Sequence, residues 1–231
     1  MTPDLDSPVP DGVLALARRL GVRTDSHPTS VHFTQEGRMR RDERASWMKF
    51  RARQTTSVDD CGFQWSAHTG PAGLVHVHDS LAEGIGALSV RAFGVLPIAS
   101  SPTSAPLTRG ELIRYMAELA WAPDAIVRNR LLQWSIDAPD QFTVTANLGL
   151  TTGSVTFTLD SAGRIASAYA PDRPRAVGGR FVQTPWRGRF GDYRHHEGYW
   201  LPFQGEVAWI VDGTDVVCWE GTLQTWRTST D

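Results

Sequence analysis

Hydrophobic and polar positions alternate in short runs along most of this chain. Runs of this kind, rich in β-branched and aromatic residues and bounded by turn residues, are typical of half-buried β-strands. In the first half of the chain they cover Val31–Arg40, Ser46–Thr56, Gly62–Thr69, Leu74–Ser80 and the glycine-interrupted Glu83–Ala99. In the second half they cover Leu131–Asp137, Gln141–Leu148, Ser154–Asp160, Arg164–Ala170, Arg189–His196, Trp200–Val211 and Val216–Trp226. The pattern predicts about nine to eleven strands, mostly antiparallel and paired in chain order.

A helical segment separates the two groups of strands. Over Thr108–Trp121 the apolar residues recur at helical spacing, and Thr108 with Glu111 forms a capping box at its start. We also expect one helical turn after Pro123 and a short amphipathic helix over Asp11–Leu20. The chain should therefore place one long helix between two sets of strands.

The central helix has two unlike faces. On a helical wheel of about 100° per residue, one side carries Leu112, Ile113, Met116, Leu119 and Ala120, and the other carries Glu111, Arg114, Tyr115, Glu118 and Trp121. A helix that packs against a core with one face exposes to water a second face of charged and polar residues, without tyrosine and tryptophan. Two interpretations stay open. Either the second face lines a cavity, or Arg114 and Glu118 form a solvent-exposed ion pair beside half-buried aromatic residues.

The length of 231 residues suits one large domain, and no repeat or composition shift marks a boundary. We expect a single domain over 1–231, with an N-terminal segment over 1–30 and a curled sheet over 31–231 into which the helix 108–121 is inserted. A large antiparallel sheet must curl or close to hide its edges. The expected fold is mainly β (α+β), with a curled sheet wrapped around the central helix.

Charge and composition narrow the classes of partner. The formal net charge is −2, from 23 basic and 25 acidic residues, which argues against nucleic-acid binding. We expect no membrane insertion, because no run of 18 apolar residues occurs. The segment Met1–Gly12 has no secretory-signal pattern, and Cys61 and Cys218 lack metal-ligand spacing. These features predict a cytoplasmic protein with two reduced thiols, while the oligomeric state stays undetermined.

Candidate acid–base groups are Glu118, Tyr115, Asp79 and Glu206, with Arg114 as an electrostatic partner. A carboxylate in a tryptophan-rich cavity has its pKa raised by desolvation and lowered by a nearby arginine, which can tune it for proton transfer near neutral pH. The structural alternative pairs Glu118 with Arg114, uses Asp79 to cap a turn, and leaves Glu206 facing water on a strand. Ion pairs with purely structural roles mimic catalytic sites in this way.

Neither a metal nor a cofactor is expected. His76 and His78 share one strand face, but the adjacent His195 and His196 would point to opposite faces, so the ligand set is incomplete. The chain has no nucleophile-elbow motif, no Walker loop and no strand-linked dinucleotide-binding glycine motif.

Nine tryptophans are spread along the predicted strands, and most must belong to the ordinary core. Some of them are expected to line a pocket for an apolar ligand. The candidate ligand-binding residues are Trp47, Trp65, Trp121, Trp186 and Trp209.

The order of several short motifs resembles a widespread bacterial family of unknown function whose central helix carries the pattern RY(L/M)AE-x-x-W-x-P. The motifs are QEGRMR (35–40), WMKFRARQ (47–54), GFQWSA (62–67), EGIG (83–86, after Asp79), ELIRYMAELAWAP (111–123), DR (172–173), PWRG (185–188), DYR followed by G and P (192–202), and EVAWIV (206–211). The resemblance runs from about Val31 onward. It implies a half-open antiparallel barrel around a helix, similar to bacterial lipoprotein-carrier folds, which hold apolar ligands. A fold-level resemblance implies a cavity but no particular reaction.

Three functions are compatible with these observations. The first is a cofactor-independent enzyme that binds a hydrophobic small molecule and catalyses proton-transfer isomerisation or cyclisation, since such reactions need only a shaped cavity, an acid and a base. The second is a non-catalytic carrier for a lipid-like ligand in the same cavity. The third is an interaction module with a filled core. Turnover of the ligand separates the first two, and the cavity volume separates both from the third.

Overall fold

The strands of the described residues form one antiparallel sheet. The structure is a computed structural model of the chain and describes residues 9–92, 96–101 and 103–230. The first group of strands comprises β1 (Ser30–Met39), β2 (Met48–Ser57), β3 (Phe63–Thr69), β4 (Val75–Ala82), β5 (Ile85–Ala92) and β6 (Leu96–Ser101). The second comprises β7 (Leu132–Ala138), β8 (Gln141–Leu148), β9 (Thr151–Leu159), β10 (Ile165–Val177), β11 (Arg180–His196), β12 (Tyr199–Val211) and β13 (Thr214–Ser229).

The helical elements are short apart from one. They are α1 (Asp11–Arg19), η1 (Pro71–Gly73), α2 (Ala105–Ala117), η2 (Glu118–Trp121) and α3 (Ala125–Arg128). The helix α2 and its continuation η2 connect the two groups of strands, as the sequence pattern predicts. No helix in the described ranges is long and apolar enough to cross a membrane.

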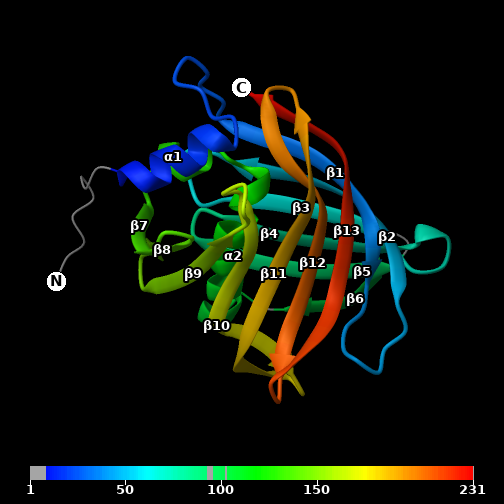
Figure 1. The fold of residues 1–231 in the computed structure, drawn as a ribbon. Helices are drawn as coiled ribbons and strands as arrows, with labels where there is room; N and C mark the ends of the chain where they lie inside the picture. Colours follow the sequence, from blue (N-terminus) through cyan, green and yellow to red (C-terminus); the bar gives the residue numbers. More distant parts are fainter. Residues whose placement is uncertain (1–8, 93–95, 102, 231) are drawn as a thin grey trace.

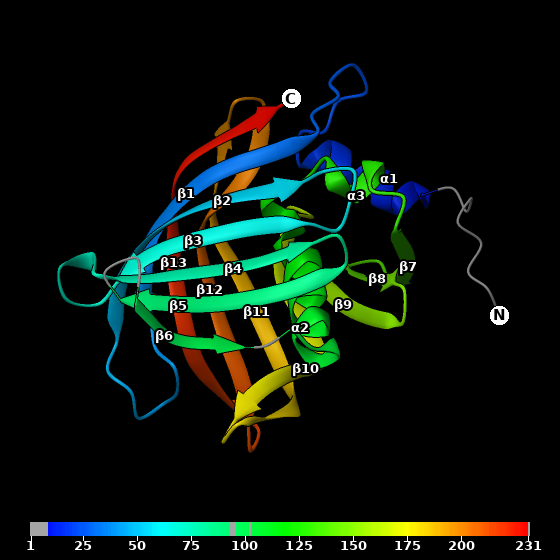
Figure 2. The same cartoon turned by 180° about the vertical axis from the view of Figure 1, so that it is seen from behind.

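The order of the 13 strands in the sheet is β6-β5-β4-β3-β2-β1-β13-β12-β11-β10-β9-β8-β7. Each strand pairs with its neighbour in the chain, and the first strand, β1, joins the last, β13, in the middle of the sheet. The two edges, β6 and β7, are the strands that α2, η2 and α3 connect. Figure 1 shows the sheet curling around α2, and Figure 2 shows β2–β5 running across the direction of β11–β13. This is the curled, half-open antiparallel barrel that the sequence predicts, with α2 on its concave face.

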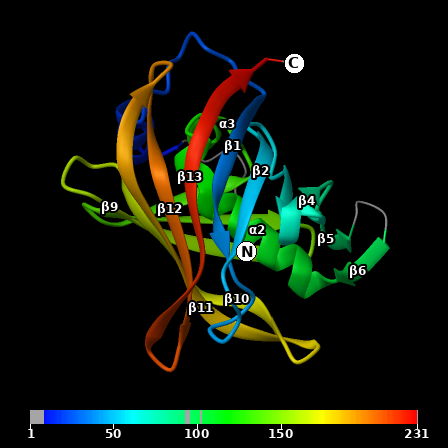
Figure 3. The same ribbon diagram turned by 90° about the vertical axis from the view of Figure 1, so that its right-hand side faces the viewer.

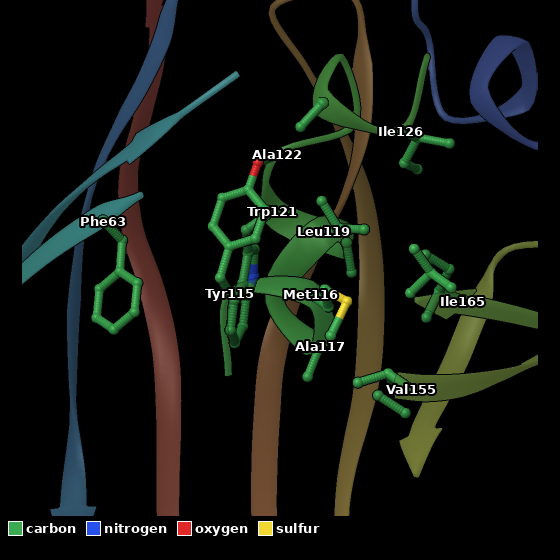
Figure 4. Packing of buried hydrophobic residues seen from close by; sticks show 14 of the residues in the cluster. Phe63, Tyr115, Met116, Ala117, Leu119, Trp121, Ala122, Ile126, Val155 and Ile165 are labelled. Carbon is green, nitrogen blue, oxygen red and sulfur yellow. The ribbon is translucent and has the colours of Figure 1, made fainter. Parts of the chain in front are cut away.

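The helix α2 approaches the sheet closely at two glycines. A Cβ atom on Gly86 of β5 would lie 2.7 Å from the Cα atom of Thr108, and one on Gly153 of β9 would lie 3.0 Å from Cε of Met116. Figure 3 shows α2 between the two crossing parts of the sheet. In Figure 4, Met116 and Leu119 lie on the side of the helix that faces Val155. The apolar face of the wheel is therefore packed against β9 and its neighbours.

The predicted start of the central helix is wrong by one turn. The residue that caps α2 is Ser104, whose hydroxyl accepts a hydrogen bond from the amide of Leu107 at 3.4 Å. The Thr108 hydroxyl instead accepts from the backbone N–H of Gly86 at 3.0 Å, and Glu111 is buried. The capping box was a false signal because both side chains bind partners outside the helix.

The sheet contains more strands than the nine to eleven expected, since 13 are described. The segment predicted as one glycine-interrupted strand is two paired strands, β5 and β6, and residues 93–95 between them lie outside the described residues. The strands β10 and β11 also extend past their predicted ends, to Val177 and back from Arg180. The extra residues of this hairpin are rich in arginine and proline, so they carry no clear hydrophobic alternation.

The helix α1 closes one end of the curled sheet. Its buried face consists of Val13, Leu16 and Ala17, and Leu20 after its end accepts a backbone hydrogen bond from Trp200 of β12 at 2.9 Å. Figure 1 shows α1 beside β7, at the end opposite the β10–β11 turn. The N-terminal segment is thus part of the same packing unit in the described residues, while one domain over 1–231 stays a prediction.

Candidate functional site

A cavity of about 260 Å³ lies between the end of α2 and the concave face of the sheet. The residues that border it come from β1, β3, β4, α2, η2 and β10–β13, which are far apart in the sequence. They are Met39, Trp65, Val77, Asp79, Arg114, Ala117, Glu118, Trp121, Arg173, Trp186, Gly188, Arg189, Phe190, Gly205, Glu206, Val207 and Trp219. The volume is just below the range of roughly 300–1,000 Å³ that is usual for small-molecule sites.

The charged side of the cavity is an ion-pair network around Arg114. Its guanidinium donates to a carboxylate oxygen of Asp79 on β4 and, at 2.8 Å, to Oε1 of Glu118. Gln54 of β2 donates to the other oxygen of Glu118 at 2.6 Å and accepts from Arg114 at 3.3 Å. The side chains of Arg114, Glu118 and Asp79 are only 15%, 16% and 11% exposed. The wheel's second interpretation, a solvent-exposed pair, is therefore wrong.

The electrostatics of Arg114 follow from this burial. Desolvation alone would lower the pKa of Arg114, but the carboxylates of Glu118 and Asp79 outweigh it and raise the pKa above its ordinary value. The guanidinium also lies 4.7 Å from the ring centre of Phe63 and 5.2 Å from that of Trp65. Arg114 is thus held by charge and by stacking together.

A buried pair of carboxyl groups adjoins the network. Glu111 of α2 lies within hydrogen-bonding range of Asp79 and is only 6% exposed. Burial raises the pKa of both groups, and the charge of Asp79 raises that of Glu111 further, to about 8, although Arg173 and Arg114 oppose the shift. At neutral pH Glu111 is therefore protonated and can donate its proton to Asp79.

The opposite side of the cavity carries a stacked arginine, Arg173 of β10. Its guanidinium lies 4.8 Å from the ring centre of Trp186 and 5.6 Å from that of Trp209. A bulge between Ala170 and Arg173 shifts the pairing of β10 with β11. Since side chains alternate along a strand, this shift turns the side chain of Arg173 to the concave face of the sheet. The neighbouring Asp172 forms an ion pair with Arg109 at 2.6 Å.

The floor of the cavity is a row of glycines covered by indole rings. Gly205 of β12 pairs with Gly221 of β13, which pairs with Gly37 of β1. A Cβ atom on Gly205 would lie 2.8 Å from the ring of Trp121, and one on Gly221 would lie 2.3 Å from the ring of Trp219. The absence of side chains in this row lets the two large rings lie against the backbone.

The structure brings together only part of the predicted site. Asp79, Arg114 and Glu118 border the cavity, and so do three of the five predicted tryptophans, namely Trp65, Trp121 and Trp186. Trp209 does not border the cavity, but it lies opposite Trp186 on the neighbouring strand and against the guanidinium of Arg173. Trp47 lies elsewhere, against the guanidinium groups of Arg38 and Arg40 at 4.6 and 4.7 Å from its ring centre.

Two predicted acid–base residues have other surroundings. The hydroxyl of Tyr115 is buried, donates to the backbone oxygen of Ser57 at 3.1 Å and accepts from Asn129 at 2.8 Å. Burial raises the pKa of Tyr115 well above its ordinary value. Glu206 is among the residues that border the cavity, but strand alternation directs its side chain to the convex face, and its carboxylate accepts from Arg189 at 2.7 Å. Neither side chain presents a free proton-transfer group to the cavity.

Sequence reasoning missed Glu111, Gln54 and Arg173 as site residues. The wheel places Glu111 on the face of Arg114, so a local signal exists, but the capping-box pattern assigns Glu111 to the start of the helix instead. Gln54 lies at an inward position of β2, which alternation alone cannot distinguish from an ordinary core position. The motif DR (172–173) marks Arg173, but the pattern of apolar and polar positions could not place its side chain, because its inward direction depends on the bulge.

The predicted metal-free state stays a prediction. In the described part of the chain, no group of three or more His, Cys, Asp or Glu residues is arranged to hold a metal ion. His76 packs edge-on against His68 of the neighbouring strand, with ring centres 4.1 Å apart, and His78 forms a hydrogen bond with Ser66 at 3.0 Å. These histidines face away from the cavity side of the sheet.

A larger groove of about 1250 Å³ lies on the convex face. Most of its charged residues are already paired with each other, as in Arg38 with Glu220 at 2.6 Å and Arg51 with Glu36 at 3.0 Å. This groove is open, and its lining is more polar than that of the smaller cavity. The smaller cavity combines aromatic walls with a few convergent polar groups, which is the usual character of a small-molecule site.

Comparisons with known proteins agree on the fold. The chain superposes on a crystal structure of a LolA superfamily protein from Nitrosomonas europaea with a TM-score of 0.50 and 13% identity, covering 97% of this chain and 95% of that one. A domain described as an outer membrane lipoprotein-sorting protein from Vibrio parahaemolyticus gives 0.51 and 13% over 98% and 94% of the chains. A DUF1329 family protein from Desulfovibrio piger gives 0.53 and 13% over 96% and 93%.

Sequence comparison gives the family but no activity. No curated protein matches the chain. The model of a family of unknown function, DUF6544, matches residues 1–221, which is nearly the whole length. With this match and its LolA-like half-barrel, the chain belongs to the DUF6544 family of unknown function.

Proposed function

We propose that this protein binds a hydrophobic small molecule in the cavity beneath α2 without transforming it. The observation that carries the proposal is the cavity itself, about 260 Å³ in volume, walled by Trp65, Trp121, Trp186 and Trp219. A module with a filled core would have no such space. Apolar surface of this kind favours the binding of an apolar ligand, because binding removes both the ligand and the cavity wall from water.

The state of the charged groups favours binding over catalysis. Both oxygens of Glu118 accept hydrogen bonds, one from Arg114 and one from Gln54. A general base needs a lone pair directed at the substrate proton. Glu118 is instead held as part of the wall. The LolA-like neighbours support the same proposal, since one of them is described as an outer membrane lipoprotein-sorting protein domain.

The enzyme of isomerase or cyclase type remains a second candidate because of one observation. Glu111 and Asp79 lie side by side next to the cavity, and burial raises the pKa of both, so a protonated acid adjoins a carboxylate that can act as a base. Asp79 borders the cavity, whereas Glu111 lies behind it. The second candidate requires that a bound ligand be changed chemically.

A displacement experiment with matched variants tests the proposal. The probe is N-phenyl-1-naphthylamine, an uncharged apolar dye whose fluorescence rises in an apolar site. Val77→Phe fills the cavity, whereas Val75→Phe makes the same change on the same strand and face outside it. We expect saturable binding by the unmodified protein, weakened about tenfold or more by Val77→Phe and within about twofold for Val75→Phe.

The melting temperature and circular dichroism of both variants control for folding. Absence of saturable dye binding, or equal binding by a folded Val77→Phe protein, would overturn the proposal. Ligands retained from a cell extract are then incubated with the protein and weighed by mass spectrometry. An unchanged ligand supports binding alone, and a time-dependent product that requires Asp79 supports the enzyme.

A further inference from the structure

Three side chains that border the cavity carry buried hydrogen-bond donors for which the protein supplies no acceptor. The indole nitrogens of Trp65 and Trp186 and the Nε atom of Arg173 are buried and have no hydrogen-bond partner. All three residues border the same cavity. Buried donors without a partner are rare in native proteins and call for an explanation, often a bound molecule. Because three such donors belong to residues around one cavity, they are a feature of the site as a whole.

The unpartnered acceptors of the site have a different explanation. Asp79 and Glu111 each have one buried oxygen with no donor from the other side chains. These two carboxyl groups lie within hydrogen-bonding range of one another, and the proton kept by Glu111 serves both. Once the Asp79–Glu111 pair is set aside, the unpartnered buried polar atoms that remain around the cavity are all hydrogen-bond donors. The molecule that completes the cavity must therefore supply acceptors.

Arg173 is the strongest of these donors. A guanidinium has five N–H donors in a rigid planar fork. In the described part of the chain, the Arg173 side chain forms no ion pair and no hydrogen bond, and it is held only by stacking on Trp186 and Trp209. This stacking fixes the plane of the fork in advance. An arginine fixed in this way and lacking protein acceptors matches the geometry of a carboxylate, which offers two parallel oxygens.

The titratable groups around Arg173 do not neutralise its guanidinium, so its counter-ion can come from a bound anion. Its nearest charged neighbours are Asp79 of β4 and Arg114 and Glu111 of α2. Asp79 is bound to Arg114, and Glu111 is protonated at neutral pH. Burial lowers the pKa of Arg173 from its ordinary value, as expected for a cation whose solvation has not been replaced by a contact ion.

We propose that the ligand is a single-chain amphiphile with a carboxylate head, whose oxygens bind the Arg173 guanidinium while its apolar chain covers the indole rings of the cavity. The inference rests on the proposed binding function and names the ligand class. The indole N–H of Trp186, in contact with Arg173, is a second donor for the head. A volume near 260 Å³ fits a medium-length chain or the end of a longer one.

Three probes with the same chain test the head group. Decanoate, 1-decanol and decyltrimethylammonium differ only in charge and hydrogen bonding at one end. At pH 7 we expect decanoate to displace N-phenyl-1-naphthylamine at a concentration about 30-fold or more below that of decanol, with the cation weakest. Titration calorimetry with decanoate measures the same preference directly.

Arg173→Gln and Arg175→Gln form the matched pair of variants. Arg175 lies 5.6 Å from the ring centre of Trp209, as Arg173 does, but it does not border the cavity. We expect Arg173→Gln to remove the preference for decanoate and leave decanol unchanged, while Arg175→Gln changes neither. Arg173→Lys keeps the charge without the fork, so it should retain a smaller preference.

The possible results separate this inference from the proposed function. Equal displacement by decanoate and decanol in the unmodified protein overturns the carboxylate head but leaves hydrophobic binding intact. Failure of all three probes and of the dye overturns both. If Arg173→Gln does not fold, the comparison of probes on the unmodified protein still decides the matter. A preference for decanoate that survives in a folded Arg173→Gln protein also overturns the inference.

Discussion

Two of the three arginines that border the cavity, Arg114 and Arg173, make a useful comparison because they differ in what surrounds their charge. Arg114 and Arg173 both border the cavity and both stack on aromatic rings. Arg114 has two carboxylates and a glutamine as partners. The guanidinium of Arg173 is in contact only with the aromatic rings of Trp186 and Trp209 among the described residues. The protein has therefore completed the solvation of one cation and left the other for a molecule that enters the cavity.

The difference indicates that, within one site, Arg114 serves the stability of the fold and Arg173 serves the binding of a ligand. Each acceptor of Arg114 is provided by the fold, from β2, β4 and η2, so this arginine connects the helix to one part of the sheet. Arg173 connects no charged groups, and its environment is costly until an anion arrives. Substitutions should therefore separate the two roles.

The largest expected effect comes from Arg114→Met compared with Arg173→Met. Loss of Arg114 leaves the buried carboxylates of Asp79 and Glu118 unpaired, which should lower the free energy of unfolding by about 3–5 kcal/mol. Loss of Arg173 removes a buried cation with no contact partner, so the change should stay within about 1 kcal/mol. Urea denaturation at pH 7 measures both. Equal destabilisation by the two substitutions would contradict the comparison.

The protonated Glu111 next to Arg114 gives the second effect, which depends on pH. Its pKa is raised to about 8 in the folded protein and lies near 4.5 in the unfolded chain. Between these values the unfolded chain binds fewer protons, so the free energy of unfolding should fall as pH rises from about 4.5 to 8, on the order of a few kcal/mol. Glu111→Gln should remove this part of the slope. Asp79, whose pKa is also raised, accounts for a remaining slope of the same sign.

Denaturation at pH 5, 6.5 and 8 compares the two proteins directly. The decisive quantity is the difference in unfolding free energy between the variant and the unmodified protein, because surface carboxylates affect both equally. A difference that does not change with pH would show that Glu111 is ionised in the folded state, and the account of the shared proton would fail.

The parts of this molecule that the sequence predicted are those with local causes. Strands such as β8, and the helix over most of Thr108–Trp121, follow from alternation or helical spacing within about ten residues. The contact of Arg114 with Glu118 follows from their separation of four residues on a helix. Wheel positions could not place Tyr115, since an enclosed helix has aromatic residues toward the core as well as the cavity.

The rest of the site depends on register and so lay beyond the sequence. Arg173 faces inward because of a bulge, and Glu206 faces outward because of the phase of β12 against its neighbours. A shift of one residue reverses every side chain of a strand, and nothing local records it. The glycine row beneath Trp121 likewise exists only through the pairing of Gly205 with Gly221.

An intermediate effect is expected from Gly205→Ala, which disturbs the cavity without touching either arginine. The new Cβ atom would lie 2.8 Å from the Trp121 ring and 3.2 Å from the Trp219 ring. We expect a loss of about 1–3 kcal/mol in unfolding free energy as the rings shift, and weaker dye binding. Gly191→Ala is the control, since a Cβ atom there meets nothing within 4 Å. Equal stability of the two variants would show that the rings do not rest on the glycine row.

The smallest effect should come from Glu206→Gln, which tests whether the convex face takes part at all. Its carboxylate binds Arg189, and the two side chains are 34% and 44% exposed, so the pair is largely screened by water. Removing one charge should change the unfolding free energy by less than about 1 kcal/mol. Because Asp215 also binds Arg189, the arginine keeps a partner. Binding of N-phenyl-1-naphthylamine and of decanoate should stay within about twofold of the unmodified protein. A clear loss of decanoate binding would place Glu206 in contact with the ligand and would mean that the cavity opens through the sheet, in which case Arg173 would not be the only determinant of the head group.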